Sequence, residues 1–185
     1  MMGRLVKAGE RVRIAVDMDE VIADSHGRHV ELYRRDFGVH LAEEQLLGRR
    51  FSEAVHEDHR LAVKQYAHEL DFFSSLSVIP DSQDVLARLY ERHDVFIASA
   101  AMEFPTSFVP KFEWLREYFP FFSWENVVFC GDKSIIAADY LIDDIPRNLE
   151  RFGGEGILFS APHNRKETRF RRVQGWAEIA ELFLD

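Results

Sequence analysis

The feature that most constrains the fold is an alternation along the chain between short apolar runs and stretches with helical spacing. The apolar runs are VRIAVD (12–17), DVFIAS (94–99), NVVFCG (126–131), YLIDD (140–144) and GILFS (156–160). Runs this continuous are typical of strands covered on both faces, as in parallel sheets. Amphipathic stretches lie at 82–93, 108–119 and 175–185. The alternation predicts an α/β fold with a doubly wound, parallel, five-stranded sheet.

One interval, residues 28–79, is much longer than a simple crossover between the first two strands requires. It contains helical patterns of its own, at 29–38, 42–48 and 52–70. We therefore predict a small helical cap at 28–79, inserted over the strand ends of an α/β core that is formed by 1–27 and 80–185.

Composition narrows the class of protein. The chain has 185 residues, of which 46% are hydrophobic, so a sizeable core needs no disulfides. The single cysteine, Cys130, cannot form an internal disulfide, and we expect a reducing, cytoplasmic location. The N-terminal segment lacks the apolar region of a signal peptide, and no run approaches the length of a membrane span. We expect no membrane partner.

The formal net charge of −9 argues against a polymeric nucleic acid as partner, because binding to polyphosphate requires clustered Lys and Arg. A small anionic substrate stays compatible with this charge, since a pocket can be locally positive on an acidic protein. The oligomeric state is left open, with a homodimer as one alternative.

Acidic side chains gather where the predicted strands end. Asp17 and Asp19 follow the first strand, Ser99 ends the second, and Asp143 and Asp144 end the fourth. Ligands of open α/β sheets bind beyond the carboxyl ends of the strands, so these side chains are expected to meet there. A lysine, in the segment GDKS, follows the third strand.

Four acids in one small space require a compensating cation. Mg²⁺ suits them, because it binds one or two carboxylates and leaves positions for water and phosphate oxygen. Together with a hydroxyl and an ammonium group, the acids describe a pocket for a phosphoryl group. One carboxylate of the DMD segment can attack phosphorus, while the other donates a proton to the leaving group and later activates water.

Each of these residues alone has an ordinary explanation. An Asp at a strand end is most often a turn former or a helix cap, Lys133 can be a solvated loop residue, and Ser99 can cap the next helix. The order DxD, Ser, Lys, DD after successive strands favours the joint interpretation. The basic stretch 163–172 is interpreted as a solvated loop and helix start, with attraction of an anionic substrate as the alternative.

The same segments give the chain a resemblance to a known superfamily. VDMDEVIAD, FIAS, DKS and LIDD resemble the four motifs of the haloacid dehalogenase-like (HAD) phosphohydrolases. More narrowly, KFEWLREYF, DKSII, LIDD and ILFSAPHNR resemble the 5'(3')-deoxyribonucleotidases and their bacterial relatives. The resemblance covers nearly the whole chain. It implies a HAD-like Rossmannoid core with a C1-type cap.

The resemblance also implies roles for the acids. Asp17 matches the nucleophile and Asp19 the general acid and base. Mg²⁺ would be held by the Asp17 carboxylate, the Asp19 backbone carbonyl and Asp144, with Asp143 supporting through water or hydrogen bonds.

Further positions match phosphate or substrate contacts of the family. Ser99 and Lys133 would bind the phosphoryl group, and Lys111 matches a second lysine near phosphate. The remaining substrate positions are Ala100, Phe51, Phe72 and Phe73, where core packing is an equal alternative for the three Phe residues.

Several positions depart from the family pattern. Glu20 stands where Gly is usual, Ser25 replaces an aromatic residue, Ala100 replaces a Ser, and Gly131 replaces an Arg. Ile145 follows the DD pair where a basic residue can occur. These changes alter substrate contacts and spare the catalytic set, so the chemistry is better supported than the substrate.

The sequence therefore predicts a Mg²⁺-dependent phosphomonoesterase that acts through an aspartyl-phosphate on a small phosphorylated metabolite. Deoxyribonucleoside 5'(3')-monophosphates are the preferred substrates. The alternatives are another small phosphomonoester, such as a sugar phosphate, and a non-catalytic phosphate-binding regulator on the same scaffold. The net charge disfavours a phosphatase that acts on polynucleotide ends.

Overall fold

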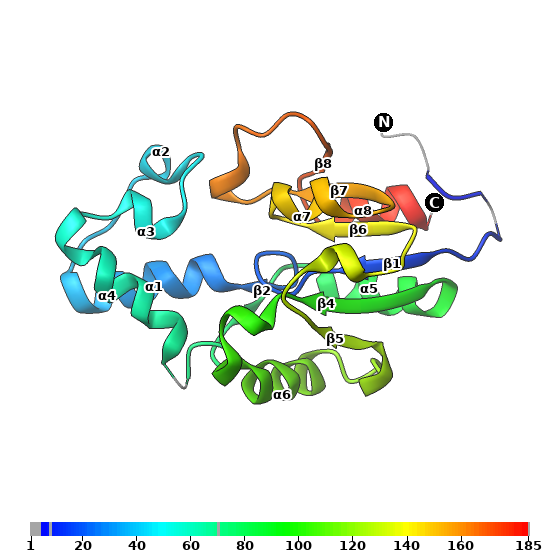
Figure 1. Ribbon diagram of the computed structural model, residues 1–185, viewed down its shortest axis with the longest axis horizontal. Coiled ribbons are helices and arrows are strands. Elements are labelled where there is room, and N and C mark those ends of the chain that lie inside the picture. The colour runs from blue at the N-terminus through cyan, green and yellow to red at the C-terminus, as the bar shows by residue number, and fades with distance from the viewer. Residues whose placement is uncertain (1–4, 8, 70, 185) are drawn as a thin grey trace.

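The computed structural model describes residues 5–7, 9–69 and 71–184, and its centre is a parallel sheet of six strands (Figure 1). The strands lie in the order β5-β4-β1-β6-β7-β8. They are β1 (Arg13–Val16), β4 (Asp94–Ser99), β5 (Val127–Phe129), β6 (Tyr140–Asp143), β7 (Glu155–Phe159) and β8 (Arg171–Val173). The predicted fold class is confirmed, with six strands in place of five. The extra strand, β8, is short and begins with two arginines, so it lacks the apolar run that marks the others.

Helices cover both faces of this sheet. The helices α5 (Ser82–Arg92), α6 (Phe108–Tyr118) and α8 (Trp176–Phe183) contribute to one large apolar cluster, which includes Ile14 and Val16 of β1. The short helix α7 (Pro146–Arg151) contributes to a second cluster, which includes Ala15 of β1. Successive residues of β1 therefore pack into different apolar clusters, which explains why the strand shows no polar alternation.

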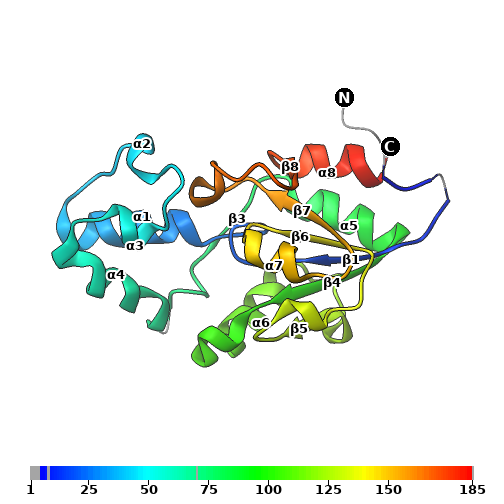
Figure 2. The ribbon, with the colours of Figure 1, turned by 45° about the horizontal axis from the view of Figure 1, so that its top comes forward.

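A second, two-stranded antiparallel sheet connects the core to the segment that follows β1. It consists of β2 (Ala23–Asp24) and β3 (Ser77–Val78), which pair residue by residue. Residues 25–76 between these strands are called the helical insert here. Figures 1 and 2 show the insert beside the sheet, beyond the carboxyl end of β1. Its helices are α1 (Ser25–Phe37), α2 (Glu43–Leu46), α3 (Phe51–Ala54) and α4 (Arg60–Gln65).

The last part of the insert is less regular than its spacing indicates. The interval 52–70 is predicted as one helical stretch, but the structure divides it into α3, α4 and two 3-10 turns, at Glu57–His59 and Tyr66–His68. The backbone is extended at Val55 (φ −77°, ψ 163°), whose side chain is buried. Burial of Val55 thus competes with helix continuation. Leu70 and Asp185, the last residues of two predicted helical stretches, lie outside the described residues.

The assignment of 28–79 as a separate cap and of 1–27 with 80–185 as the core stays a prediction. Within the described ranges, no helix is both long enough and apolar enough to cross a membrane.

Candidate active site

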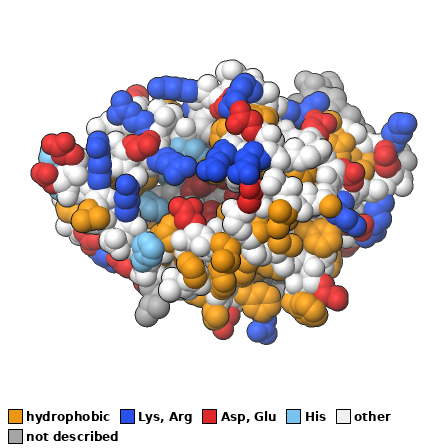
Figure 3. Space-filling view, in the orientation of Figure 1, with side chains coloured by type: hydrophobic (Ala, Val, Ile, Leu, Met, Phe, Trp, Pro, Cys, Tyr) orange, Lys and Arg blue, Asp and Glu red, His pale blue; other side chains and the backbone are white. Residues whose placement is uncertain are grey.

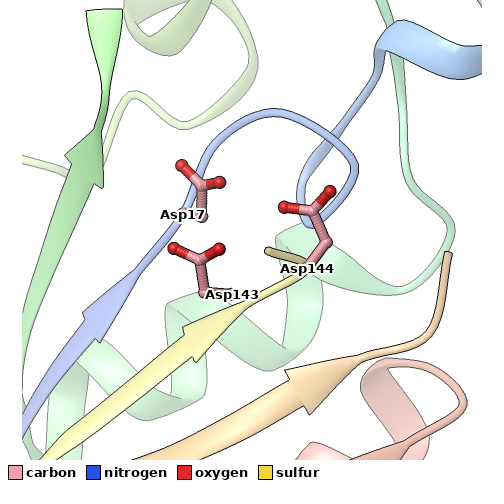
Figure 4. Close-up of side chains that lie close together, drawn as sticks. All are labelled: Asp17, Asp143 and Asp144. Carbon is pink, nitrogen blue, oxygen red and sulfur yellow. The ribbon is translucent and has the colours of Figure 1, made fainter. Parts of the chain in front are cut away.

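Three acidic side chains converge at the carboxyl edge of the sheet. Asp17 directly follows β1, Asp143 ends β6, and Asp144 is the next residue. Because β1 and β6 are parallel neighbours, their ends lie side by side. Each carboxylate offers one oxygen, and these three oxygens lie within 4.8 Å of one another (Figure 4).

Lys133 lies between two of these acids. Its Nζ is 2.6 Å from Asp17 Oδ1 and 2.6 Å from Asp143 Oδ2, and it is buried. Burial by itself would lower the pKa of Lys133, but the carboxylates of Asp143 and Asp17 outweigh burial and raise it. Lys133 is therefore a permanent cation of the site and cannot be a solvated loop residue.

Both carboxylate oxygens of Asp143 have hydrogen-bond or ion-pair partners. Besides Lys133, its carboxylate accepts hydrogen bonds from the Ile145 amide at 2.8 Å and from the Asn148 side chain at 3.0 and 3.1 Å. Asp143 is thus an anchor, while Asp17 and Asp144 retain free coordinating capacity.

The acidic cluster has more negative charge than one lysine neutralises. Burial raises the pKa of Asp17 to about 6, opposed by Lys133 and assisted by Asp143. Burial, followed by the charges of Asp143 and Asp17, raises the pKa of Asp144 well above its usual value. Buried oxygen ligands with this excess charge suit a hard divalent cation, whose charge would favour the ionised carboxylates. The donor set therefore supports a metal site.

A second lysine lies beside Asp19. Lys111, on α6, forms an ion pair with Asp19 Oδ2 and donates to Ser99 Oγ at 3.1 Å. Its ammonium also lies 4.5 Å from the centre of the Phe73 ring. The other oxygen of Asp19, Oδ1, is buried and has no hydrogen-bond partner within the described part of the chain. This oxygen is thus unpaired but closed to solvent, and the Asp19 side chain is not part of the three-acid cluster.

A cavity of about 240 Å³ opens above these groups, lined by Asp17, Asp19, Lys111, Asp144 and Ala100, among others. A larger cavity of about 530 Å³ in the helical insert includes Phe51, Phe72 and Phe73 in its lining. The two cavities share Asp19, Ser25, His29, Arg50, Phe51, Glu103 and Phe104 as lining residues.

Each predicted substrate-binding position lines one or both of these cavities: Phe51, Phe72, Phe73, Ala100 and Lys111. Ser99 and Lys133, which are predicted to bind the phosphoryl group, line neither cavity. Figure 3 shows acidic side chains in a hollow bordered by Lys and Arg, and the cavity lining includes Arg49 and Arg50. A locally basic rim thus accompanies the acidic overall charge.

Glu20 and Ser25, two of the positions that differ from the family pattern, contact each other. Ser25 Oγ donates to Glu20 Oε1 at 2.6 Å, and Glu20 has a positive φ of 60°. Burial raises the pKa of Glu20 to about 7, against the effect of the Ser25 hydrogen bond. A non-glycine residue in this conformation is strained, so the Ser25 contact helps to hold Glu20 at the cavity wall.

Sequence reasoning missed four polar residues of this region. Asn148 on α7 binds Asp143, while His163 and Asn164 contact Asp144. Arg172 on β8 binds Asn164. The interpretation of 163–172 as a solvated loop and helix start is wrong for His163, Asn164 and Arg172, because each is at least half-buried and hydrogen-bonded. The stretch ends in strand β8, and its residues, all of which the structure describes, form no α-helix. The segment ILFSAPHNR, which resembles the family, contains two of these four residues. It carries no acid at a strand end, so it could not be identified from the strand ends.

Comparisons with known proteins agree with this geometry. Residues 10–185 match the family described as 5' nucleotidase, deoxy (pyrimidine), cytosolic type C protein. A Bacillus subtilis 5'(3')-deoxyribonucleotidase is 41% identical over 92% of this chain and 98% of its own length. A Staphylococcus epidermidis protein, provisionally given the same name, is 46% identical over 94% of this chain and 96% of its own length.

Solved structures agree on the fold. A haloacid dehalogenase-like family hydrolase from Streptococcus pneumoniae matches with a TM-score of 0.60 at 10% identity, covering 95% of this chain and 99% of that one. A HAD-superfamily hydrolase of subfamily IA from Geobacter sulfurreducens matches with a TM-score of 0.57 at 14% identity, covering 92% and 95%. The chain has the HAD-like fold, is a phosphoric monoester hydrolase, and belongs to the 5' nucleotidase, deoxy (pyrimidine), cytosolic type C family.

Proposed function

We propose that this hydrolase is Mg²⁺-dependent, that it forms an aspartyl-phosphate on Asp17, and that it dephosphorylates deoxyribonucleoside 5'(3')-monophosphates. One observation carries the proposal: Asp17, ion-paired with Lys133, lines the same cavity as Asp19, which keeps one buried oxygen free. The name of the Bacillus subtilis relative supports the choice of substrate.

The contacts of Asp17 suit a nucleophile. Its Oδ1 accepts a hydrogen bond from the Met18 amide at 2.7 Å and forms the ion pair with Lys133. These two donors orient the carboxylate and favour its ionised form, while the second oxygen is free of both. Attack by the carboxylate on phosphorus forms the acyl phosphate and releases the alcohol.

Asp17, Asp144 and the Asp19 backbone carbonyl would hold Mg²⁺, with Asp143 acting through water or hydrogen bonds. When bound, the ion neutralises charge on the phosphoryl oxygens. Lys133, Lys111 and the Ser99 hydroxyl add fixed positive charge and a donor around the same oxygens.

Asp19 is suited to proton transfer. In the first step it donates a proton to the oxygen of the leaving alcohol, and in the second it takes a proton from the water that attacks the acyl phosphate. Asp19 lines both cavities, so its side chain lies beside the space that the substrate would occupy.

Residues of the helical insert are proposed to contact the base and the charged groups of the nucleotide. Phe51, Phe72 and Phe73 line the larger cavity, where aromatic faces can contact a nucleobase. Arg50 lines both cavities and adds positive charge for a nucleotide. The cap role of residues 28–79, the cytoplasmic location and the homodimer stay predictions.

The test is phosphate release from a panel of 5' and 3' deoxyribonucleotides, ribonucleotides, sugar phosphates and a generic aryl phosphate, with Mg²⁺ and with EDTA. We expect deoxyribonucleotides to give the highest kcat/KM, and both EDTA and Asp17→Asn to abolish turnover. Asp94→Asn is the control, because Asp94 forms an exposed ion pair with Arg11 at the opposite end of β4. Acid-quenched protein should carry one labile phosphate on Asp17.

Turnover that persists in Asp17→Asn or in EDTA would contradict the mechanism. A preference for sugar phosphates would retain the chemistry and replace the substrate. Phosphate binding without turnover across the whole panel would favour the regulatory alternative.

A further inference from the structure

The residue after β6, Asp144, has a backbone that is restrained from a different part of the chain. Its carbonyl oxygen accepts hydrogen bonds from Asn164 Nδ2 at 2.8 Å and from His163 Nε2 at 3.1 Å. His163 Nε2 also lies 3.3 Å from the Asp144 carboxylate. Both residues belong to the turn that follows β7, so the position of Asp144 depends on that turn.

Asn164 is buried, and its side-chain amide is fully used. Besides Asp144, Nδ2 donates to the Phe159 carbonyl at 2.8 Å. Its Oδ1 accepts from the Ala161 amide at 3.2 Å and from Arg172 Nη1 at 2.8 Å. Two donations and two acceptances exhaust the capacity of an amide group and fix its orientation. The side chain therefore joins the end of β7 rigidly to Asp144.

Arg172, on β8, reinforces this arrangement. Its guanidinium donates to Asn164 Oδ1, to the carbonyls of Asn164 and Glu167 at 2.8 and 2.7 Å, and to Ser160 Oγ at 3.1 Å. Within residues 5–7, 9–69 and 71–184 it forms no ion pair with a carboxylate. A half-buried guanidinium that serves only neutral acceptors acts as a geometric restraint on the turn.

We propose that Asn164, held in place by Arg172, is a positioning residue that fixes Asp144 for metal binding. The inference rests on the proposed metal site and extends it to residues that lie outside the four motifs. Residues that orient metal ligands typically change metal affinity about 10- to 100-fold when they are removed. Loss of the Asn164 amide should leave Asp144 with its carboxylate but without its fixed position.

The experiment measures Mn²⁺ and Mg²⁺ binding by calorimetry, together with melting in EDTA, for Asn164→Ala and Arg172→Lys. We expect about 10- to 100-fold weaker metal binding for Asn164→Ala and a smaller loss for Arg172→Lys. The metal concentration for half-maximal hydrolysis should rise in parallel, with kcat at saturating metal changed less than the affinity. Asn126→Ala is the matched control, because Asn126 binds the Val95 carbonyl and Tyr90 at the opposite edge of the sheet. It should lower the melting temperature without changing metal affinity.

A folded Asn164→Ala protein with the metal affinity of the wild type would overturn the proposal. If Asn164→Ala does not fold, Arg172→Lys provides the test, and wild-type metal affinity in that variant would also overturn the proposal. Wild-type protein that binds metal but hydrolyses no phosphomonoester would overturn the proposed function alone, because the affinity difference between variants is measured without substrate.

Discussion

Two regions of the cavity differ in how their side chains are held. The acidic floor consists of Asp17, Asp143, Asp144 and Lys133, which come from strand ends and the turn after β5. Ion pairs with Lys133 connect Asp17 and Asp143, and Asp144 lies beside them. The aromatic wall consists of Phe51, Phe72 and Phe73, which come from the helical insert. Lys133 forms ion pairs with both Asp17 and Asp143, so one substitution disturbs several groups. The wall rests on apolar contacts, which tolerate exchange more readily. The floor is therefore suited to conserve the chemistry while the wall adapts to a substrate.

The largest expected effect is at Asp19, which lines both cavities. In Asp19→Asn the leaving group receives no proton, so kcat for a nucleoside monophosphate should fall about 10²- to 10⁴-fold. An aryl phosphate needs little protonation of its leaving group. It should still give a rapid burst of one equivalent of phenol, followed by slow turnover as the acyl phosphate waits for hydrolysis. Rapid-quench kinetics measures both phases.

The control for Asp19→Asn is Asp58→Asn, because the Asp58 side chain is 80% exposed on the insert. If Asp19→Asn slows the release of phenol from the aryl phosphate as much as the release of nucleoside from the nucleotide, Asp19 is not the acid that protonates the leaving group.

The second prediction concerns the stability of the metal-free protein as a function of pH, which depends on the acids of the floor. Burial raises the pKa of Asp17 to about 6, above the value of about 4 in an unfolded chain. Protonated Asp17 thus stabilises the metal-free fold below about pH 4, and this contribution is lost as the pH rises through 6. In EDTA, Asp17 should contribute a fall of about 1–2 kcal/mol in the free energy of unfolding between about pH 5 and 7.5. The raised pKa of Glu20 acts in the same direction over this range.

Denaturant unfolding at each pH measures this slope. Mg²⁺ should remove it, and Asp144→Asn should make it shallower in EDTA because one carboxylate is gone. A free energy of unfolding that rises with pH in EDTA would contradict the electrostatic description of the floor.

The smallest effect concerns the wall. Phe51→Leu removes an aromatic face from both cavities, so KM for a deoxyribonucleotide should rise about 3- to 10-fold with kcat little changed. The KM for glycerol phosphate, which lacks a base, should stay constant. Phe152→Leu is the matched control, since Phe152 is similarly buried (7% exposed, against 9% for Phe51) but packs beside α7. An equal change in KM for both variants would assign Phe51 to core packing.

The position of the acids in the floor could be predicted from the sequence because it depends only on the topology of the sheet. Parallel strands bring their carboxyl ends to one edge, so an acid directly after an apolar run can be placed without knowing any contact. Asp17 and Asp143 satisfy this condition, and the structure joins both side chains to Lys133. Ser99, a hydroxyl at the end of β4, contacts Lys111.

The remaining parts depend on tertiary contacts. The strand β8 has only three residues and no apolar run, and α3 ends at Val55, whose backbone is extended and whose side chain is buried. Asn164 and Arg172 are polar residues in a basic stretch, which composition alone assigns to solvent. Their importance lies in hydrogen bonds to backbone carbonyls, and such bonds leave no periodicity in the sequence.

The pairing of β2 with β3 has a consequence for how such chains can diversify. Ala23 lies opposite Val78 and Asp24 opposite Ser77, so the insert leaves and re-enters the core through two adjacent strands. Outside this pair, a hydrogen bond from the Gly48 amide to the Pro162 carbonyl, 2.8 Å long, also ties the insert to the core. A segment of another length, with its ends equally close, could replace residues 25–76 without shifting the register of the six-stranded sheet. The length of the insert can therefore change during evolution while the strand ends that carry Asp17 and Asp143 keep their places in the sheet.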